Sequence, residues 1–572
     1  MAEDDTFLCA CCQGPGTPAT LTACTGCYLV HYCNRECQKK HWSFHKASCK
    51  SPLARSDWQP EWMDSDRRPG FVNAGAPVVS FGGKSYLWGN VPALDVIQLH
   101  QNEGETYKKD LDLLFAASGD LRNVVKSLAA LPTTYKNSVS LVLNDRDFEI
   151  VARNTLMLLA ACAIPEKSTA VDLILHLWYS STIRPKHLYL LTTHVRPLIE
   201  DVVRKVAGKA ADSLQRKTWN FGGITVRLSL PQGMWSELLP YFEVPTGLTG
   251  EEAHRIRTAV TLARKDHFER KLIPQVPAHR VCKQRFRTTG IMLPFGHSIQ
   301  DFTVPNPTFF QTAAWPMSDA ADPHAGWSWE DVLDTGSGLA KNDLNGKLVI
   351  YIKQHLADFY DSLRARACAF SLLNVDAATL QDHVPKSKFA RVEVANIVDR
   401  GYLGIINTLH CLGPLLQNPS DNPHATMLTL FMNAVPQMFS ALPQQEQLSV
   451  QKSEMVLANP YIIPPTNVKL PLSQYHSFRV MMSDATQLVR DMDKYFDKQV
   501  TQRPCAYAEM SQFPLIPECY GVVAKEPHTI VEKWPLRLKA LPHESGAQEA
   551  FQRLLSSSRT GAERYVEWKR IV

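Results

Sequence analysis

The chain of 572 residues lacks the features of secreted and membrane proteins. Residues 1–5 (MAEDD) are acidic and no apolar run follows them, so no signal peptide is expected. No apolar run reaches the ~18 residues that a membrane-spanning helix requires. We therefore expect a soluble intracellular protein, in the nucleus or the cytoplasm, with no membrane partner.

A strong charge imbalance is lacking too. The formal net charge is only +5, spread over the whole chain. Residues 1–50 carry no basic stripe that could follow a phosphate backbone. Nucleic acid is therefore not an expected partner.

The motifs of common catalytic sites are also missing. The sequence contains no His-Glu-x-x-His and no Gly-x-Ser-x-Gly, and Asp334-Thr335-Gly336 has no second copy to complete an aspartic protease pair. A P-loop is excluded because Val78 stands where its first glycine belongs. We assign no catalytic residue, and an enzyme is not the favoured interpretation.

Cysteine is sparse and scattered after the first fifty residues. The cysteines there stand singly, at Cys162, Cys282, Cys368, Cys411, Cys505 and Cys519. Isolated cysteines are typical of a reducing compartment and argue against a disulfide framework.

Metal-type ligands are instead concentrated at the start of the chain, in regular pairs. The pairs are Cys9-x2-Cys12, Cys24-x2-Cys27, Cys33-x3-Cys37 and His45-x3-Cys49, and Cys11 is a spare. A tetrahedral zinc site takes four nitrogen or sulfur ligands, so four pairs fill two sites. Each site would be full, with no position open for water, which indicates structural zinc. The spacing does not decide whether the pairs are used sequentially or interleaved.

The residues around these pairs resemble the MYND finger. The resemblance includes Tyr32 before Cys33, and Gln38, His41 and Trp42 after Cys37. It implies interleaved sites, with Cys9, Cys12, Cys33 and Cys37 in one and Cys24, Cys27, His45 and Cys49 in the other. It leaves His31 and His41 as non-ligands. It also implies a protein-binding module for proline-containing peptides.

Gln38 and Trp42 are the candidate peptide-binding residues. They lie four apart on the helix expected over residues 35–46, so they share one face. An indole beside an amide can hold an extended peptide and bond its backbone. The alternative is that Trp42 only packs the small core of the finger.

The rest of the chain is divided by composition and pattern. We expect the MYND finger in residues 1–50, a proline-containing linker in 51–80, an α/β Rossmann-like domain in 81–270 and a mixed α/β region in 271–572. Continuity of the last region with the preceding domain is left open. The predicted fold class is a small two-zinc finger followed by a large α/β body with a Rossmann-like parallel sheet and additional helical regions.

The pattern is clearest between residues 112 and 161. Buried strands are predicted at 112–117 and 138–143, and helices at 121–130, capped by Asp120, and at 148–161. Short connections between them indicate a parallel sheet. Further along, an amphipathic helix is predicted over 348–373 and a strand over 391–398. In that strand Glu393 is the one unexpected charge, read as solvent-facing or cleft-facing, with a functional acid as the alternative.

A second resemblance covers most of the body. It is carried by residues 87–95, 118–123, 143–145, 152–154, 306–310, 315–319 and 391–397. These look like a fungal family in which a poorly characterised domain follows a MYND finger, and like the N-terminal domain of axonemal dynein-arm assembly factors. The resemblance implies no established activity.

The α/β pattern also raises the possibility of a nucleotide-type ligand. Gly119 lies in the turn after the first strand and Asp145 ends the second, which is the half-Rossmann layout for S-adenosylmethionine or a dinucleotide. Asp120 at the helix start opposes a phosphate. With one glycine in the turn, we expect S-adenosylmethionine to bind no tighter than about millimolar.

Together these features predict a zinc-binding protein-protein interaction factor, whose finger recruits proline-containing motifs in a regulatory or assembly role. The alternative is an S-adenosylmethionine-dependent methyltransferase-like enzyme with the finger as its recruiting module.

Overall fold

The computed structural model describes residues 7–65, 67–71, 81–461, 482–502 and 520–571. Its centre is a nine-stranded sheet that combines strands from both expected α/β regions. In spatial order the strands are β14 (Val522–Ala524), β15 (Arg564–Arg570), β13 (Thr426–Phe431), β12 (Arg391–Glu393), β5 (Leu111–Phe115), β6 (Val139–Asn144), β11 (Cys368–Leu373), β9 (Ile224–Pro231) and β8 (Leu214–Phe221).

The strands from β13 to β9 run parallel to their neighbours, whereas β15, β14 and β8 are added by antiparallel pairing. The first strand in the chain, β5, lies inside the parallel set. The chain passes from β5 to β6 on one side and later returns to β12 on the other side. The order therefore reverses between β5 and β12, and the predicted parallel α/β body is confirmed.

Helices cover both faces of this sheet because its side chains alternate between two cores. Leu113 and Phe115 of β5 join one apolar cluster, and Leu114 joins the other. The first cluster includes side chains of α3 (Arg122–Ala129), α4 (Phe148–Ala163), α5 (Lys167–Tyr179) and α13 (Leu344–Ala365). The second includes side chains of α14 (Gly404–Leu412), α15 (Ala434–Ser440) and α18 (Met492–Gln502).

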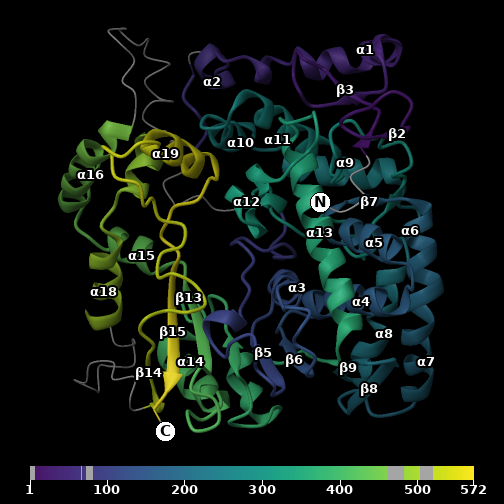
Figure 1. Ribbon diagram of the computed structural model, residues 1–572, viewed down its shortest axis with the longest axis vertical. Helices are drawn as coiled ribbons and strands as arrows, with labels where there is room; N and C mark the ends of the chain where they lie inside the picture. Colours follow the sequence, from purple (N-terminus) through teal and green to yellow (C-terminus); the bar gives the residue numbers. More distant parts are fainter. Residues whose placement is uncertain (1–6, 66, 72–80, 462–481, 503–519, 572) are drawn as a thin grey trace.

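The remaining helices pack around this body (Figure 1). They are α6 (Pro185–Leu190), α7 (Arg196–Val206), α8 (Gln232–Ser236), α9 (Gly250–Thr261), α10 (Lys265–Leu272), α11 (Pro277–Thr289), α12 (Trp329–Asp334), α16 (Gln444–Ala458) and α19 (Ala547–Ser556). Two short strands, β7 (Thr182–Ile183) and β10 (Val304–Pro305), pair antiparallel apart from the main sheet. No helix within the described ranges is both long and apolar enough to cross a membrane.

The finger contains two small hairpins and one helix. Its elements are β1 (Phe7–Leu8), β2 (Pro15–Gly16), β3 (Thr22–Ala23), β4 (His31–Tyr32) and α1 (Arg35–Cys49). After it, the short helix α2 (Glu61–Asp64) lies against α10, where the backbone N–H of Glu61 donates to Glu269 at 2.9 Å. Trp62 is buried at this contact. The part of the expected linker from 72 to 80 lies outside the described residues.

Two sequence expectations differ from the structure. The helix predicted over 348–373 ends at Ala365, and Cys368–Leu373 forms the interior strand β11. These six residues alternate between buried and half-buried, so pairing with β6 and β9 overrides their helical propensity. Asp120 was expected to cap the next helix, but Leu121 occupies that position and Asp120 lies one residue earlier.

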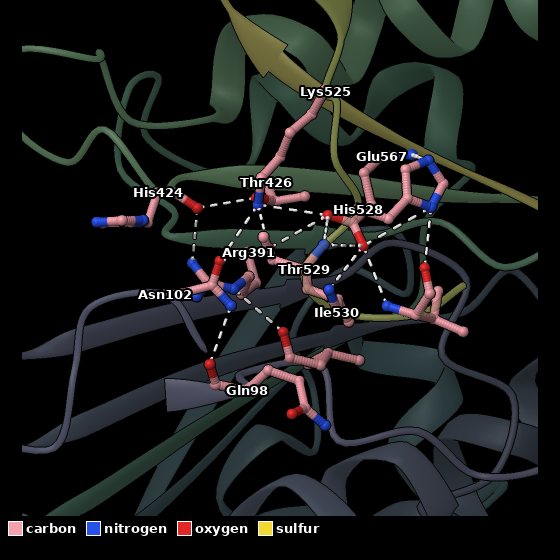
Figure 2. Close-up of polar contacts among 12 residues, drawn as sticks. Gln98, Asn102, Arg391, His424, Thr426, Lys525, His528, Thr529, Ile530 and Glu567 are labelled. Carbon is pink, nitrogen blue, oxygen red and sulfur yellow. Dashed lines mark hydrogen bonds and ion pairs between the residues drawn. The ribbon is translucent and has the colours of Figure 1, made fainter. Parts of the chain in front are cut away.

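A buried polar network holds the antiparallel edge of the sheet to the rest of the body (Figure 2). Glu567 of β15 is fully buried and accepts the backbone N–H groups of Thr529, Ile530 and Val531 at 2.7–3.1 Å. The ammonium of Lys525 lies 3.3 Å from the same carboxylate. Each oxygen of Glu567 therefore has partners, as a buried charge requires.

Candidate functional site

The ligands in the first fifty residues form two compact sets. One contains Cys9, Cys12, Cys33 and Cys37, and the other contains Cys24, Cys27, His45 and Cys49. Within each set all ligand atoms lie within 4.8 Å of one another. The pairs are therefore interleaved, as the resemblance implies, and the spare Cys11 belongs to neither set.

Local structure explains how the second half of the finger presents its ligands. Asn34 follows Cys33 and caps α1, its side-chain oxygen accepting the backbone N–H of Cys37 at 2.9 Å. The cap places Cys37 in the first turn of α1, and His45 and Cys49 follow further along the helix. His31 is no ligand, because its Nε2 accepts the backbone N–H of Ala340 at 3.0 Å.

The ligand sets fit zinc. With a Zn–S bond of about 2.3 Å, neighbouring sulfurs of a tetrahedral site lie about 3.8 Å apart. The Sγ atoms of Cys24 and Cys49 are 3.8 Å apart, and those of Cys12 and Cys33 are 3.5 Å apart. The Sγ of Cys27 is 3.3 Å from Nε2 of His45, consistent with a shorter Zn–N bond. Four protein ligands fill each site, so both zinc ions are structural.

One side of the finger is docked on the body. The side chain of Gln13 donates to the carbonyl of Gly296 at 3.1 Å and accepts the N–H of Ser298 at 3.1 Å. Asn342 donates to the carbonyl of Cys27 at 2.8 Å. Leu29 and Val30 of the finger are buried in the same apolar cluster as the helices of the body. The finger is therefore held as part of the body surface.

The candidate peptide residues lie on α1, the helix that also carries the ligands His45 and Cys49. Figure 1 shows α1 at the outer end of the molecule. Gln38 and Trp42 are both half-buried on this helix, and Trp42 joins none of the apolar clusters among the described residues. Phe44, 79% exposed, lies beside His41 with ring centroids 6.4 Å apart. Sequence reasoning missed Phe44, although an aromatic residue among the polar residues of this helix could have indicated an exposed contact ring.

A cleft with a volume of about 760 Å³ opens at the carboxyl ends of the parallel strands. It is lined by residues that follow β5, β6, β12 and β13, so it lies where the strand order reverses. The three residues assigned to a cofactor from sequence all line it, namely Gly119, Asp120 and Asp145.

Contacts within the cleft give these three residues different roles. The backbone N–H of Gly119, which has a φ of +53°, donates to the carboxylate of Asp145 at 3.0 Å. Asp120 accepts the N–H of Gly89 at 2.8 Å and pairs with Arg122 at 2.6 Å. Asp120 is thereby committed to local structure, and Asp145, whose Oδ1 also accepts the N–H of Asp147 at 3.0 Å, holds the turn after β6 while lining the cleft.

Glu393, interpreted from the sequence as solvent-facing or cleft-facing, lines the cleft from an interior strand. Its strand, β12, pairs with β5 and β13, and its side chain is 6% exposed and lines the cleft. Oε1 accepts the N–H of Ala395 at 2.7 Å, and no residue that the structure describes bonds Oε2. Burial raises the pKa of Glu393 to about 7, against the opposing effects of the Ala395 N–H and the guanidinium of Arg122.

Comparison with known families gives two matches. The MYND finger family matches residues 9–49, and a domain of unknown function (DUF4470) matches residues 87–183. No curated protein and no solved structure matches the chain. The predicted MYND finger with two zinc ions is confirmed. The DUF4470 match covers β5, β6 and the loops that form one wall of the cleft.

Proposed function

We propose that this protein is a zinc-dependent interaction factor whose finger recruits proline-containing peptide segments through Gln38 and Trp42. The MYND match indicates a zinc-binding protein-interaction module. The observation that carries the proposal is that residues outside α1 dock the finger on the body, while α1 itself lies at the outer end of the molecule. Gln13, Cys27 and His31 contact the body, while Gln38 and Trp42 lie on the outward helix α1.

The chemistry of α1 supports an extended peptide. The side-chain amide of Gln38 has no hydrogen bond within the described part of the chain. It can therefore bond a peptide backbone. The indole of Trp42 lies edge-on to His45, with ring centroids 6.1 Å apart. Proline rings pack on such indoles. A polyproline segment also loses little entropy on binding, because its conformation is preformed.

The body gives the recruited partner a fixed orientation. Since the finger is bonded to residues 296–298 and 340–342, a bound peptide would be held at a constant position relative to the sheet. This geometry suits a regulatory or assembly role, as does the resemblance of the body to the N-terminal domain of dynein-arm assembly factors. We place the protein in the nucleus or the cytoplasm, where the cysteine ligands stay reduced.

The test uses the full chain with zinc and an array of fluorescent proline-containing peptides. Selected peptides should bind the wild type, and Gln38→Ala and Trp42→Ala should each weaken binding while the zinc content stays unchanged. Lys40→Ala, on the opposite side of α1, is the matched control and should bind normally. Absence of any peptide selection by the wild-type chain would refute the proposal.

A further inference from the structure

The cleft at the end of the sheet is a built site for a small molecule. Open α/β sheets bind ligands at the carboxyl ends of their strands where the strand order reverses, because adjacent loops diverge there. In this chain that position lies between β5 and β12, and the cleft occupies it. Its volume of about 760 Å³ falls within the range of small-molecule sites.

The turn after β5 does not offer a phosphate site. A phosphate needs free backbone N–H groups at the turn and the following helix start. Here the N–H of Gly119 is bonded to Asp145, and the N–H of Ser118 donates to the carbonyl of Asn144 at 2.8 Å. Asp120 adds a carboxylate just before α3. A dinucleotide or a nucleotide is therefore disfavoured.

The lining is instead acidic. Its carboxylates are Asp120, Asp145, Asp147, Asp376 and Glu393, and its guanidinium groups are Arg122 and Arg146. Arg122 pairs with Asp120 at 2.6 Å, and Arg146 lies 3.7 Å from Asp147. The other three carboxylates have no ion-pair partner among the described residues. The cleft thus favours a positively charged ligand.

Glu393 supplies the independent sign of a missing ligand group. A buried acceptor without a partner costs free energy, and native structures rarely leave one unless a ligand, ion or water completes it. Oε2 of Glu393 is such an acceptor, on a side chain that lines the cleft and is only 6% exposed.

Two further features fit a nucleoside. Asp145 directly follows β6, where an acid in this type of sheet accepts the hydroxyl groups of a ribose. It lies two strands from Glu393, or roughly 10 Å at the usual strand spacing, which is comparable to the length of a nucleoside. Tyr86 and Tyr402 line the cleft and are 67% and 55% exposed, so their rings are free to stack on a base.

We propose that this cleft binds a positively charged nucleoside without phosphate, of the S-adenosylmethionine type. Asp145 accepts the ribose hydroxyls, Glu393 faces the cationic end and Tyr402 packs on the base. The single glycine of the turn led us to expect affinity no tighter than millimolar. Glu393 and the rim tyrosines are the additions that lead us to expect tighter binding. The site is independent of the peptide function of the finger.

The test is calorimetry on the full zinc-loaded chain. S-Adenosylmethionine should bind with a Kd below about 100 μM. AMP and NAD should bind at least tenfold more weakly because of their phosphates, and S-adenosylhomocysteine more weakly because its sulfur is neutral. Glu393→Gln, Asp145→Asn and Tyr402→Ala should each weaken S-adenosylmethionine binding about tenfold or more.

The controls separate binding from folding and from net charge. Glu251→Gln removes a carboxylate from the exposed start of α9 and should leave the Kd unchanged. Tyr402 is largely exposed, so its variant tests the site even if a buried substitution unfolds the chain. No saturable S-adenosylmethionine binding up to about 1 mM, equal binding of AMP, or unchanged binding in folded Glu393→Gln would each overturn the proposal.

Discussion

The finger and the sheet-edge cleft treat their polar groups in opposite ways. In the finger, each ligand belongs to a complete set of four, and the carbonyl of Cys27 and the ring of His31 are bonded to the body. In the cleft, Glu393 is buried yet leaves Oε2 without a partner among the described residues. A complete polar set stabilises the fold, whereas an incomplete one costs stability and marks a position for a ligand.

Removing a zinc ligand should have the largest effect on the stability of the chain. Structural zinc contributes on the order of 10 kcal/mol or more of folding free energy per site. Cys33→Ser should therefore release zinc and lower the thermal stability of the chain, including the body surface on which the finger is docked. The wild type should contain two zinc ions per chain by elemental analysis. Cys11→Ser is the matched control, since Cys11 lies in neither set, and it should retain both.

The network around Glu567 is a second example of a complete polar set, and it contains no metal ligand. Glu567→Ala would leave the N–H groups of Thr529, Ile530 and Val531 and the ammonium of Lys525 without their acceptor. Removing one partner of a buried pair typically costs 3–5 kcal/mol, so we expect a destabilisation of about 4 kcal/mol in urea unfolding. A loss of less than about 1 kcal/mol would show that the network contributes little.

The carboxylate of Glu567 stabilises the fold, whereas the ionised carboxylate of Glu393 should destabilise it. Its pKa is raised from 4.5 to about 7 by burial, and the groups that face it are Arg122 and Tyr565. The folded chain thus holds this proton more tightly than the unfolded chain. The stabilisation is complete below pH 4.5 and is lost as the pH rises through 7, a change of roughly 3 kcal/mol.

Glu393→Gln removes this titration. At pH 8 and without ligand, the variant should be more stable than the wild type by up to about 3 kcal/mol, and near pH 5 the two should differ little. Urea unfolding at both pH values measures this, with Glu251→Gln as the charge control. Equal stability of variant and wild type at pH 8 would mean that Glu393 is satisfied in solution.

The smallest effect on stability is expected at Trp42, which is half-buried and joins none of the apolar clusters among the described residues. Trp42→Ala should change the midpoint of unfolding little and leave zinc bound. It should weaken peptide binding by about 2 kcal/mol, or roughly 30-fold, as for a central aromatic contact. Phe44→Ala shows by the same fluorescence titration whether the exposed ring extends the groove. If Trp42→Ala lowers stability as much as Cys33→Ser, Trp42 belongs to the packed side of the finger.

The sequence by itself determined the finger and the start of the sheet. The spacing of the four ligand pairs between Cys9 and Cys49 indicated two zinc sites, because a tetrahedral site takes four ligands, and the resemblance supplied the interleaved pairing. Apolar runs and short turns were enough for β5, β6, α3 and α4, since these elements follow one another closely and their pattern is local.

Tertiary structure decided the rest, because it depends on contacts between distant segments. Cys368–Leu373 becomes a strand only through its pairing with β6 and β9. The docking of the finger joins Cys27 to Asn342, and the cleft brings Asp145 and Glu393 to one edge of the sheet. Burial of Glu393 without a partner arises from packing of β12 between β5 and β13, and no local pattern of residues encodes it.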